Sequence, residues 1–324
     1  MRYTQWQGLQ LKEGLADSLQ SINFVIFDVD GVLVDAKESY PRAIRDAVQH
    51  YAATLPQAAR APKACTVELD HIPLFKAAGG FNDEWILTYA ACLWLTWCHF
   101  SDHALSLSQF MEEVANAGGG IEAAQLVMHA RAGSMAPTVY QWCRQDVVTR
   151  LAQEYYAGSE DTYSLFGIPP QLGNIYGHHH LERDLLSPRE IDPWADHVAL
   201  YTGRNDPETE FVLARSGLHP YFPSERRITA SSGITKPNPA GLELLIGNAP
   251  KTRALFVGDT MDDLRSAQNF QAQHPQEQTL WFAGVTGGSM GESSANTFAE
   301  HGADLIVPSV NALLAALFSL RHSA

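Results

Sequence analysis

Several polar side chains with catalytic potential stand beside short apolar runs in this chain. They are Asp28, Asp30, Thr202, Lys236, Asp259 and Asp263. Carboxylates can act as nucleophiles, exchange protons or bind hard cations such as Mg²⁺, and a lysine ammonium can neutralise anionic groups. A fold that gathered these groups would supply one site with a nucleophile, a second acid, a hydroxyl, a cation and metal ligands.

The apolar runs predict the β-strands that would position these side chains. INFVIF leads into the turn-forming DVDG, and HVALY, RALFVG, QTLWFA and the weaker DLIV are comparable runs. Helical patterns alternate with them, over PETEFVLARSG, NPAGLELLIG, DDLRSAQNFQA and SVNALLAALFSL. This alternation predicts an α/β fold with a doubly wound parallel sheet, in which ligands bind at the carboxyl ends of the strands.

The local spacing adds two expectations about how the polar groups converge. Alternate residues of an extended strand share a face, so Asp28 and Asp30 could both point toward one cleft. Lys236 lies in a loop before a helix whose start is marked by Pro237 and Pro239. The carboxylates and the ammonium are therefore expected at the same edge of the sheet.

A long helical block interrupts the alternation between residues 37 and 190. Helices are predicted over residues 38–55, 82–100, 105–117, 121–132 and 138–157, with Gly-rich and Pro-containing breakers between several of them. We therefore expect a discontinuous catalytic core, residues 1–36 and 191–324, with an inserted all-α domain over residues 37–190. Trp94 and Trp97 are expected in the core of that inserted domain.

Composition narrows the class of partner. The 324 residues carry a formal net charge of −14 and no basic run, which argues against nucleic acid and anionic membrane as partners. The apolar stretch Trp85–Phe100 is too short to span a bilayer, and MRYTQWQGLQ lacks the features of a secretory signal, so a cytoplasmic protein is expected. The four cysteines form no CxxC pair, which predicts reduced, mostly buried thiols.

Four segments resemble the motifs of a known superfamily. DVDGV, TGR, KPNP and GDTMDD are similar to motifs one to four of the haloacid dehalogenase superfamily, in the same order and each in its expected strand-end or loop context. The helical block resembles the cap that one subfamily (IA) carries between motifs one and two. The resemblance implies a Rossmann-like core with an all-α cap, and the activity of a phosphoric monoester hydrolase.

Carried over by position, the resemblance gives each motif residue a role. Asp28 would be the nucleophile that forms an aspartyl-phosphate. Asp30 would protonate the leaving alkoxide and later take a proton from the hydrolytic water. Thr202 and the backbone N–H of Gly203 would hold phosphoryl oxygens, and Lys236 would neutralise the nucleophile and the phosphoryl charge.

The same resemblance implies a magnesium site and contacts to substrate. Mg²⁺ would be bound by Asp28, the backbone carbonyl of Asp30 and Asp259, with Asp263 as a direct ligand or one layer further out. Without the cation these carboxylates would repel one another and the substrate. The residues predicted to contact substrate besides Gly203 are Arg204, Lys76 and Arg183.

The histidine run His178–His180 is a candidate for a second metal site. Adjacent histidines in an irregular loop rarely point at one ion, so the sequence favours a solvated or hinge loop. The cap as a whole is predicted to move against the core through linkers near Val34–Lys37 and Ser187–Pro193 and to exclude water from the site.

Two alternatives to a small-metabolite phosphatase stay open at this point. A phosphomutase of the same superfamily shares the aspartyl-phosphate and differs in what attacks it. A non-catalytic phosphometabolite-binding or protein-binding module could keep the fold without turnover. Asp30 disfavours a halide-removing hydrolase, and a small phosphorylated metabolite such as a sugar phosphate or phosphoglycolate is the expected substrate.

Overall fold

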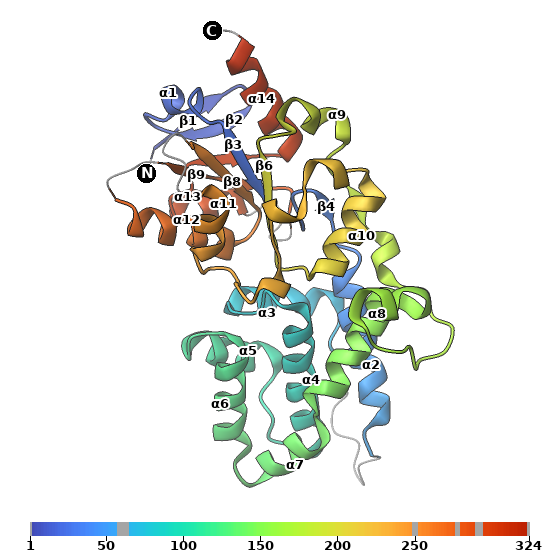
Figure 1. The fold of residues 1–324 in the computed structure, drawn as a ribbon. Coiled ribbons are helices and arrows are strands. Elements are labelled where there is room, and N and C mark those ends of the chain that lie inside the picture. Colours follow the sequence, from blue (N-terminus) through green and yellow to red (C-terminus); the bar gives the residue numbers. More distant parts are fainter. Residues whose placement is uncertain (1, 57–64, 248–251, 276–278, 289–293, 323–324) are drawn as a thin grey trace. The chain divides into compact units, whose positions relative to one another are not determined.

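The computed structural model describes residues 2–56, 65–247, 252–275, 279–288 and 294–322, and the chain divides into two compact units. The sheet unit comprises Met1–Lys37 and Glu182–Ala324, and the helical unit comprises Glu38–Leu181. The insertion of one unit into the other follows the order of elements along the chain, in which the elements described between β4 and β5 are all helices. In Figure 1 the first segment of the sheet unit is blue, and the second runs from yellow-green to red.

The main sheet lies in the sheet unit, and its strands over the described residues are mostly parallel. Their order is β1 (Tyr3–Trp6), β2 (Leu9–Lys12), β10 (Leu305–Val307), β9 (Leu280–Val285), β8 (Ala254–Gly258), β3 (Phe24–Phe27), β6 (Val198–Tyr201) and β7 (Arg227–Ile228). β3 pairs in parallel with both β8 and β6, so it is central. β1 and β2 form an antiparallel hairpin at one edge.

Helices cover both faces of this sheet. They are α1 (Ala16–Leu19), α9 (Pro188–Ile191), α10 (Asp206–Ser216), α11 (Ala240–Ile246), α12 (Met261–Gln273), α13 (Ser294–Glu300) and α14 (Val310–His322). Val25 and Phe27 of β3 belong to the core shared with α10 and α14, whereas Ile26 belongs to the core shared with α11, α12 and α13. Figure 1 shows α11 and α12 together beside β8 and β9. The fold confirms the predicted doubly wound parallel sheet.

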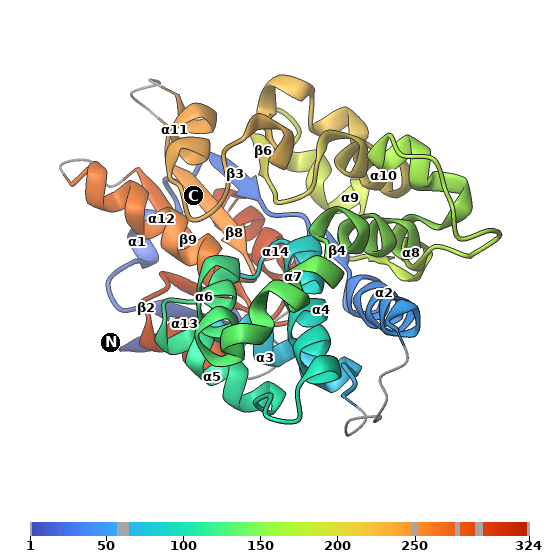
Figure 2. The same cartoon turned by 90° about the horizontal axis from the view of Figure 1, so that it is seen from below.

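The helical unit contains no strand among its described residues. Its α-helices are α2 (Tyr40–Thr54), α3 (Ile72–Ala78), α4 (Glu84–Phe100), α5 (Leu107–Asn116), α6 (Gly120–Ala132), α7 (Ala136–Trp142) and α8 (Gln145–Phe166). α4 is buried on nearly every side from Leu87 to Cys98, and Figures 1 and 2 both place it between α2 and α6. Trp94 and Trp97 lie in this core as predicted. No described helix of the chain is long and apolar enough to cross a membrane.

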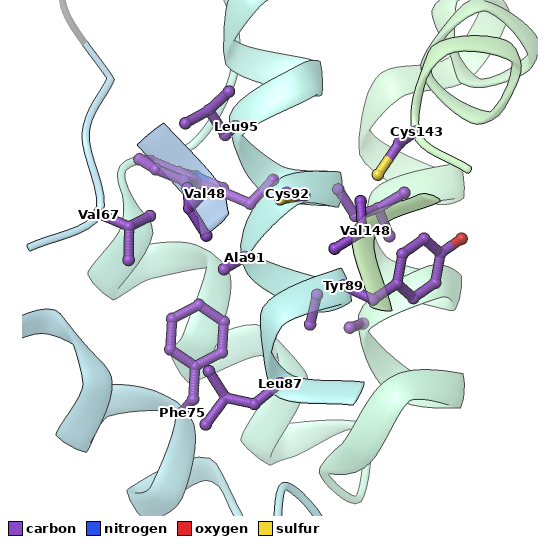
Figure 3. Close-up of a cluster of buried hydrophobic side chains, with 14 of the residues drawn as sticks. Val48, Val67, Phe75, Leu87, Tyr89, Ala91, Cys92, Leu95, Cys143 and Val148 are labelled. Carbon is purple, nitrogen blue, oxygen red and sulfur yellow. The ribbon is translucent and has the colours of Figure 1, made fainter. Parts of the chain in front are cut away.

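The core of the helical unit is apolar, and Figure 3 shows side chains from α2, α3, α4 and α8 meeting in it. Cys92, Cys98 and Cys143 are buried in this unit and, like the half-buried Cys65, are free thiols. Burial raises the pKa of the Cys92 thiol well above its usual value. Cys92, Cys98 and Cys143 are therefore apolar packing residues, and Cys92 is held as a protonated thiol.

Several predicted element bounds differ from the observed ones. The helix predicted over residues 138–157 is two helices, because Cys143 leaves helical geometry between α7 and α8. α8 then continues to Phe166 across a kink at Gly158, whose φ is +72°. The β1–β2 hairpin and α3 lie in segments for which no element was predicted.

The return from the helical unit also differs from the predicted boundary near residue 190. β4 (Val34–Asp35) and β5 (Arg183–Asp184) pair antiparallel in a small second sheet, and the N–H of Leu185 donates to the carbonyl of Leu33 at 2.8 Å. Leu186 is buried in the core of the sheet unit. These contacts tie the residues after Leu181 to the sheet unit, so the division lies between Leu181 and Glu182.

Candidate active site

Three adjacent parallel strands end at the polar residues singled out in the sequence. Asp28 follows β3, Thr202 follows β6 and Asp259 follows β8. β3 lies between the other two strands in the sheet. The carboxyl ends of parallel strands share one edge, which is where doubly wound sheets bind ligands.

A buried carboxylate cluster stands at this edge. Oxygen atoms of Asp28, Asp259 and Asp263 all lie within 4.8 Å of one another, and these residues are 5%, 1% and 0% exposed. The ammonium of Lys236 lies 2.8 Å from Asp28 Oδ1 and 2.6 Å from Asp263 Oδ1. The structure thus brings together residues from motifs one, three and four.

The electrostatics of the cluster follow from its burial. Burial raises the pKa of Asp28 well above its usual value, and the neighbouring carboxylates Asp263 and Asp259 raise it further, while the charge of Lys236 opposes them. Burial by itself would lower the pKa of Lys236, but the charges of Asp263 and Asp28 more than offset this and raise it. The single positive charge of Lys236 does not balance three carboxylates, so a bound cation would stabilise the cluster further.

The start of α12 fixes the orientation of Asp263. Thr260 caps this helix: its hydroxyl accepts from the Asp263 N–H, and its own N–H donates to Asp263 Oδ2 at 3.0 Å. The Thr260 hydroxyl also donates to Oδ2, at 2.6 Å, which leaves Oδ1 facing Lys236. Gly258 is required here, because a Cβ at that position would lie 2.4 Å from the Asp263 Cβ.

Glycines also enclose Asp259. A Cβ added at Gly31 would lie 2.0 Å from Asp259 Oδ2, and one added at Gly288 would lie 2.2 Å from the same oxygen. Any larger side chain would displace the carboxylate from this position. The backbone of two loops therefore approaches this carboxylate closely, which glycine alone allows at both positions.

Asp30 is held by a buried arginine. Arg204 is 2% exposed; its Nη2 lies 2.6 Å from Asp30 Oδ1 and 2.8 Å from Glu182 Oε1, and its Nε donates to Asp30 Oδ2 at 3.1 Å. The side chain of Glu182 is fully buried. Sequence reasoning missed Glu182, because it lies outside the motifs and only its burial beside Arg204 distinguishes it.

The TGR segment after β6 supplies the remaining polar groups. The Thr202 hydroxyl is buried and accepts from the N–H of Arg204 at 3.2 Å. Gly203 is exposed, so its backbone is accessible to a ligand. Arg204 was predicted to contact substrate; its observed partners are instead Asp30 and Glu182, and the predicted substrate contact stays a prediction.

The other two residues predicted to contact substrate are Lys76 and Arg183. Lys76 belongs to the helical unit, where its ammonium donates to the carbonyl of Phe81 at 2.8 Å and pairs with Glu84 at 2.9 Å. Arg183 is exposed in β5, opposite Asp35. Their roles remain predictions.

Comparisons with known proteins agree with this architecture. The model of a haloacid dehalogenase-like hydrolase family matches residues 189–271. A search of the curated proteins found no match.

Similar solved structures include phosphatase Tt82 from Thermococcus thioreducens. It is 22% identical, covers 91% of this chain and 98% of its own, and superposes with a TM-score of 0.58. A target of the Northeast Structural Genomics Consortium is 17% identical. The match covers 94% of this chain and all of the target, with a TM-score of 0.63. At these identities the structures show a shared fold. Together with the family match over residues 189–271 and the four ordered motifs, this fold makes the chain similar to the haloacid dehalogenase-like hydrolases.

Proposed function

We propose that this protein is a magnesium-dependent phosphatase that cleaves a small phosphomonoester through an aspartyl-phosphate on Asp28. The observation that carries the proposal is the buried group of Asp28, Asp259 and Asp263 with Lys236 in contact with two of the three carboxylates. A nucleophilic carboxylate beside a cation and further metal-binding carboxylates suits transfer of an anionic phosphoryl group better than it suits a neutral substrate.

The residues present fit a magnesium ion. The donors are hard carboxylate oxygens, which Mg²⁺ prefers, and the glycines at positions 31 and 288 let the backbone approach the Asp259 carboxylate without displacing it, as a larger side chain would. Asp28, Asp259 and Asp263, with the backbone carbonyl of Asp30, would hold the ion. When bound, Mg²⁺ would offset the repulsion between these carboxylates and the phosphate ester.

In the proposed first step, the Asp28 carboxylate attacks phosphorus while the bond from phosphorus to the ester oxygen breaks. Asp30 donates a proton to the departing alkoxide. Lys236 stabilises the charge on the phosphoryl group, and Thr202 with the N–H of Gly203 binds its oxygens. In the second step Asp30 takes a proton from water, the water oxygen bonds to phosphorus, and the bond between phosphorus and Asp28 breaks.

The likeness to phosphatase Tt82 supports the choice of a phosphate ester over other hydrolysable groups. A cap inserted between motifs one and two supports a small substrate, because a moving cap can exclude water around a small ester. The leaving group is proposed to be a sugar or another small hydroxylated metabolite.

Asp28→Asn tests the nucleophile. The amide is nearly isosteric, so we expect the fold to persist while turnover of a phosphomonoester falls by at least about 10³-fold. Asp35→Asn is the matched control: Asp35 follows in the same segment, and its Oδ1 accepts from the N–H of Lys37 at 3.2 Å, so the activity of this variant should stay near wild type.

Acid quenching during turnover should trap phosphate covalently on the wild-type chain and on the control, but not on Asp28→Asn. Normal turnover by Asp28→Asn would refute the mechanism. Chelation should abolish phosphate release and added Mg²⁺ restore it, so undiminished activity in chelator would remove the metal from the proposal. Transfer of phosphate to a second site of the product, instead of release, would identify a mutase.

A further inference from the structure

We propose that Asp161, His179 and His180 form a second metal site in the helical unit, suited to Zn²⁺ or a similar borderline transition metal. The ligand atoms of these three residues all lie within 4.8 Å of one another. The carboxylate comes from α8, and both imidazoles come from the short 3₁₀ segment His178–Leu181. All three belong to the helical unit and are independent of the carboxylates of the sheet unit.

Both imidazoles present the same ring nitrogen to the same carboxylate. His179 Nε2 lies 3.0 Å from Asp161 Oδ2, and His180 Nε2 lies 3.9 Å from that oxygen. Ligands on a tetrahedral Zn²⁺ at about 2.0 to 2.2 Å stand roughly 3.3 Å apart, which lies between these two distances. Small side-chain adjustments would therefore bring all three donors onto one ion.

A backbone contact sets the tautomer of His179. Its Nδ1 lies 2.9 Å from the carbonyl oxygen of Tyr156, and a carbonyl only accepts, so Nδ1 carries the hydrogen. In the neutral ring Nε2 then holds the lone pair that faces Asp161. A histidine whose other nitrogen donates to a backbone carbonyl is the usual arrangement of metal-binding histidines.

The backbone is shaped to bring these segments together. Gly158 kinks α8 three residues before Asp161, and a Cβ there would lie 2.4 Å from the backbone nitrogen of Gly177. A Cβ at Gly177 would lie 2.4 Å from the carbonyl carbon of Ala157. Two glycines thus allow the histidine segment to lie directly against the kinked helix.

Hydrogen bonds around Ser159 hold the two segments in this position. The N–H of Ser159 donates to the carbonyl of Ile175 at 3.0 Å, and the N–H of Ile175 donates to the Ser159 hydroxyl at 2.8 Å. The placement of the histidines against Asp161 is therefore fixed by the main chain before any ion binds.

The histidine run is not the solvated loop favoured from the sequence. His179 is fully buried, whereas the side chains of Asp161 and His180 are 26% and 33% exposed. His178 points elsewhere, with its Nε2 2.7 Å from Asp46. The site therefore has one buried ligand and two that solvent reaches, which gives an ion a route in and leaves a position for water.

An ion pair between a protonated His179 and Asp161 is the competing arrangement. It would account for the 3.0 Å contact of one ring, but the second ring faces the same carboxylate and its centroid lies 3.9 Å from that of His179. One divalent cation satisfies both imidazoles and the carboxylate without placing like charges on adjacent rings. Two nitrogens and one oxygen favour Zn²⁺ over Mg²⁺ or Ca²⁺.

The experiment measures metal bound to the full-length chain. The protein is stripped with chelator, returned to buffer with excess Mg²⁺ to saturate the acidic cluster, and titrated with Zn²⁺ or Co²⁺. We expect one Zn²⁺ per chain and a visible Co²⁺ spectrum of low-coordinate type. Asp161→Asn and His180→Asn, both at exposed ligands, should each weaken binding by more than about tenfold. His178→Asn, the adjacent histidine with a different partner, should bind as wild type does.

Two results would overturn the site. One is wild-type Zn²⁺ binding no tighter than that of the Asp161→Asn, His180→Asn double variant. The other is equal loss in His178→Asn, which would indicate unspecific binding by a histidine-rich segment. Circular dichroism of each stripped variant confirms that any loss is not unfolding, and the readouts do not depend on phosphatase activity.

Discussion

Arg204 connects two carboxylates from distant parts of the sequence, Asp30 and Glu182. With a 1% exposed side chain, it is too enclosed to serve as a general surface cation, and two of its nitrogens contact the Asp30 carboxylate. Such a geometry restricts the Asp30 rotamer. Arg204 is therefore expected to be a positioning residue that acts through Asp30.

Arg204→Gln should reveal this role through its dependence on the leaving group. An alkyl phosphate needs protonation of its leaving oxygen, so we expect kcat/KM to fall by about 100-fold, whereas a p-nitrophenyl ester, whose leaving group needs little protonation, should lose far less. Arg204→Lys should recover part of the alkyl-ester activity. Steady-state kinetics on both esters measure the difference.

Arg215→Gln is the matched control for this test. Arg215 contacts Glu182 at 3.2 Å and Asp184 at 3.0 Å but makes no observed contact with Asp30. The Arg215→Gln variant should leave kcat/KM unchanged for both esters. If Arg204→Gln lowered kcat/KM equally for the two esters, the arginine would be shown to stabilise the fold or bind substrate, and not to position Asp30.

Glu208 gives a pH-dependent contribution to stability. Burial raises the pKa of Glu208 to about 7, although the charge of nearby Arg204 acts to lower it; Asp30 and Glu182 raise it further. The unfolded chain ionises this group near 4.5. The folded state therefore favours the protonated acid, and its stabilising contribution is complete below about pH 4.5 and is lost as the pH rises through 7.

Glu208→Gln should remove this dependence. Between about pH 5 and pH 8 the free energy of unfolding of the wild type should fall relative to that of the variant by on the order of 2 kcal/mol. The amide oxygen can still accept from the N–H of Asn205, as Glu208 Oε2 does at 3.1 Å. Denaturant titrations at both pH values measure it, and parallel pH profiles would contradict the prediction.

The sequence alone located the site residues that directly follow an apolar, strand-like run. Asp28, Thr202 and Asp259 each follow an apolar run, so strand-end logic predicted their common edge. Glu182 and Glu208 carried no such signal, because their importance comes from burial beside Arg204, which depends on tertiary packing. The pairing of His179 and His180 with Asp161 was likewise invisible, since it requires the kink at Gly158.

Among the elements, α12 couples a helix cap to the candidate site. Thr260→Ala removes the hydroxyl that accepts from the Asp263 N–H and donates to Asp263 Oδ2. We expect a loss of about 1 kcal/mol in unfolding free energy and a lower affinity for Mg²⁺, because Asp263 loses its orientation. Chemical denaturation and isothermal titration calorimetry measure the two effects.

Thr260→Ser keeps the hydroxyl and is the conservative control. It should retain both stability and metal affinity, since serine caps helices as well as threonine does. If Thr260→Ala lowered stability without changing Mg²⁺ affinity, the cap would be structural only.

Some elements escaped sequence reasoning for reasons particular to them. In YTQWQGLQLK the two strands of the β1–β2 hairpin flank a tight turn, where φ is +46° at Gln7 and +80° at Gly8. The burial of YTQW does not alternate between buried and exposed, and LQLK alternates over only four residues, so the hairpin carries little period-two signal. The break between α7 and α8 has no proline or glycine, so nothing local in the sequence marked it.

At the scale of the whole molecule, the two units have separate apolar cores, so we expect a substitution in one core to destabilise that unit alone. Leu93 is fully buried in the helical unit, and Leu93→Ala should cost about 2 to 5 kcal/mol there. We expect faster amide hydrogen exchange throughout the helical unit, with the strands of the sheet unit still protected. Mass spectrometry of exchanged peptides resolves the two units.

Leu255→Ala in β8 is the converse substitution, at a position equally buried in the sheet unit. It should accelerate exchange in the sheet strands and leave α4 protected. Uniform acceleration over the whole chain by either variant would show that the two units unfold as one cooperative body.

The short ladder between β4 and β5 gives the chain an unexpected topology. Val34 pairs with Asp184 and Asp35 with Arg183, so β4 and β5 resemble the two strands of a β-hairpin, and the helical unit stands in the chain where the connecting loop would be. Once the helical unit folds with its two ends close together, pairing β4 with β5 carries little further entropic cost of loop closure. The sheet unit could then accept a two-residue turn in place of the whole insertion, and a chain joined in this way should keep its strand order.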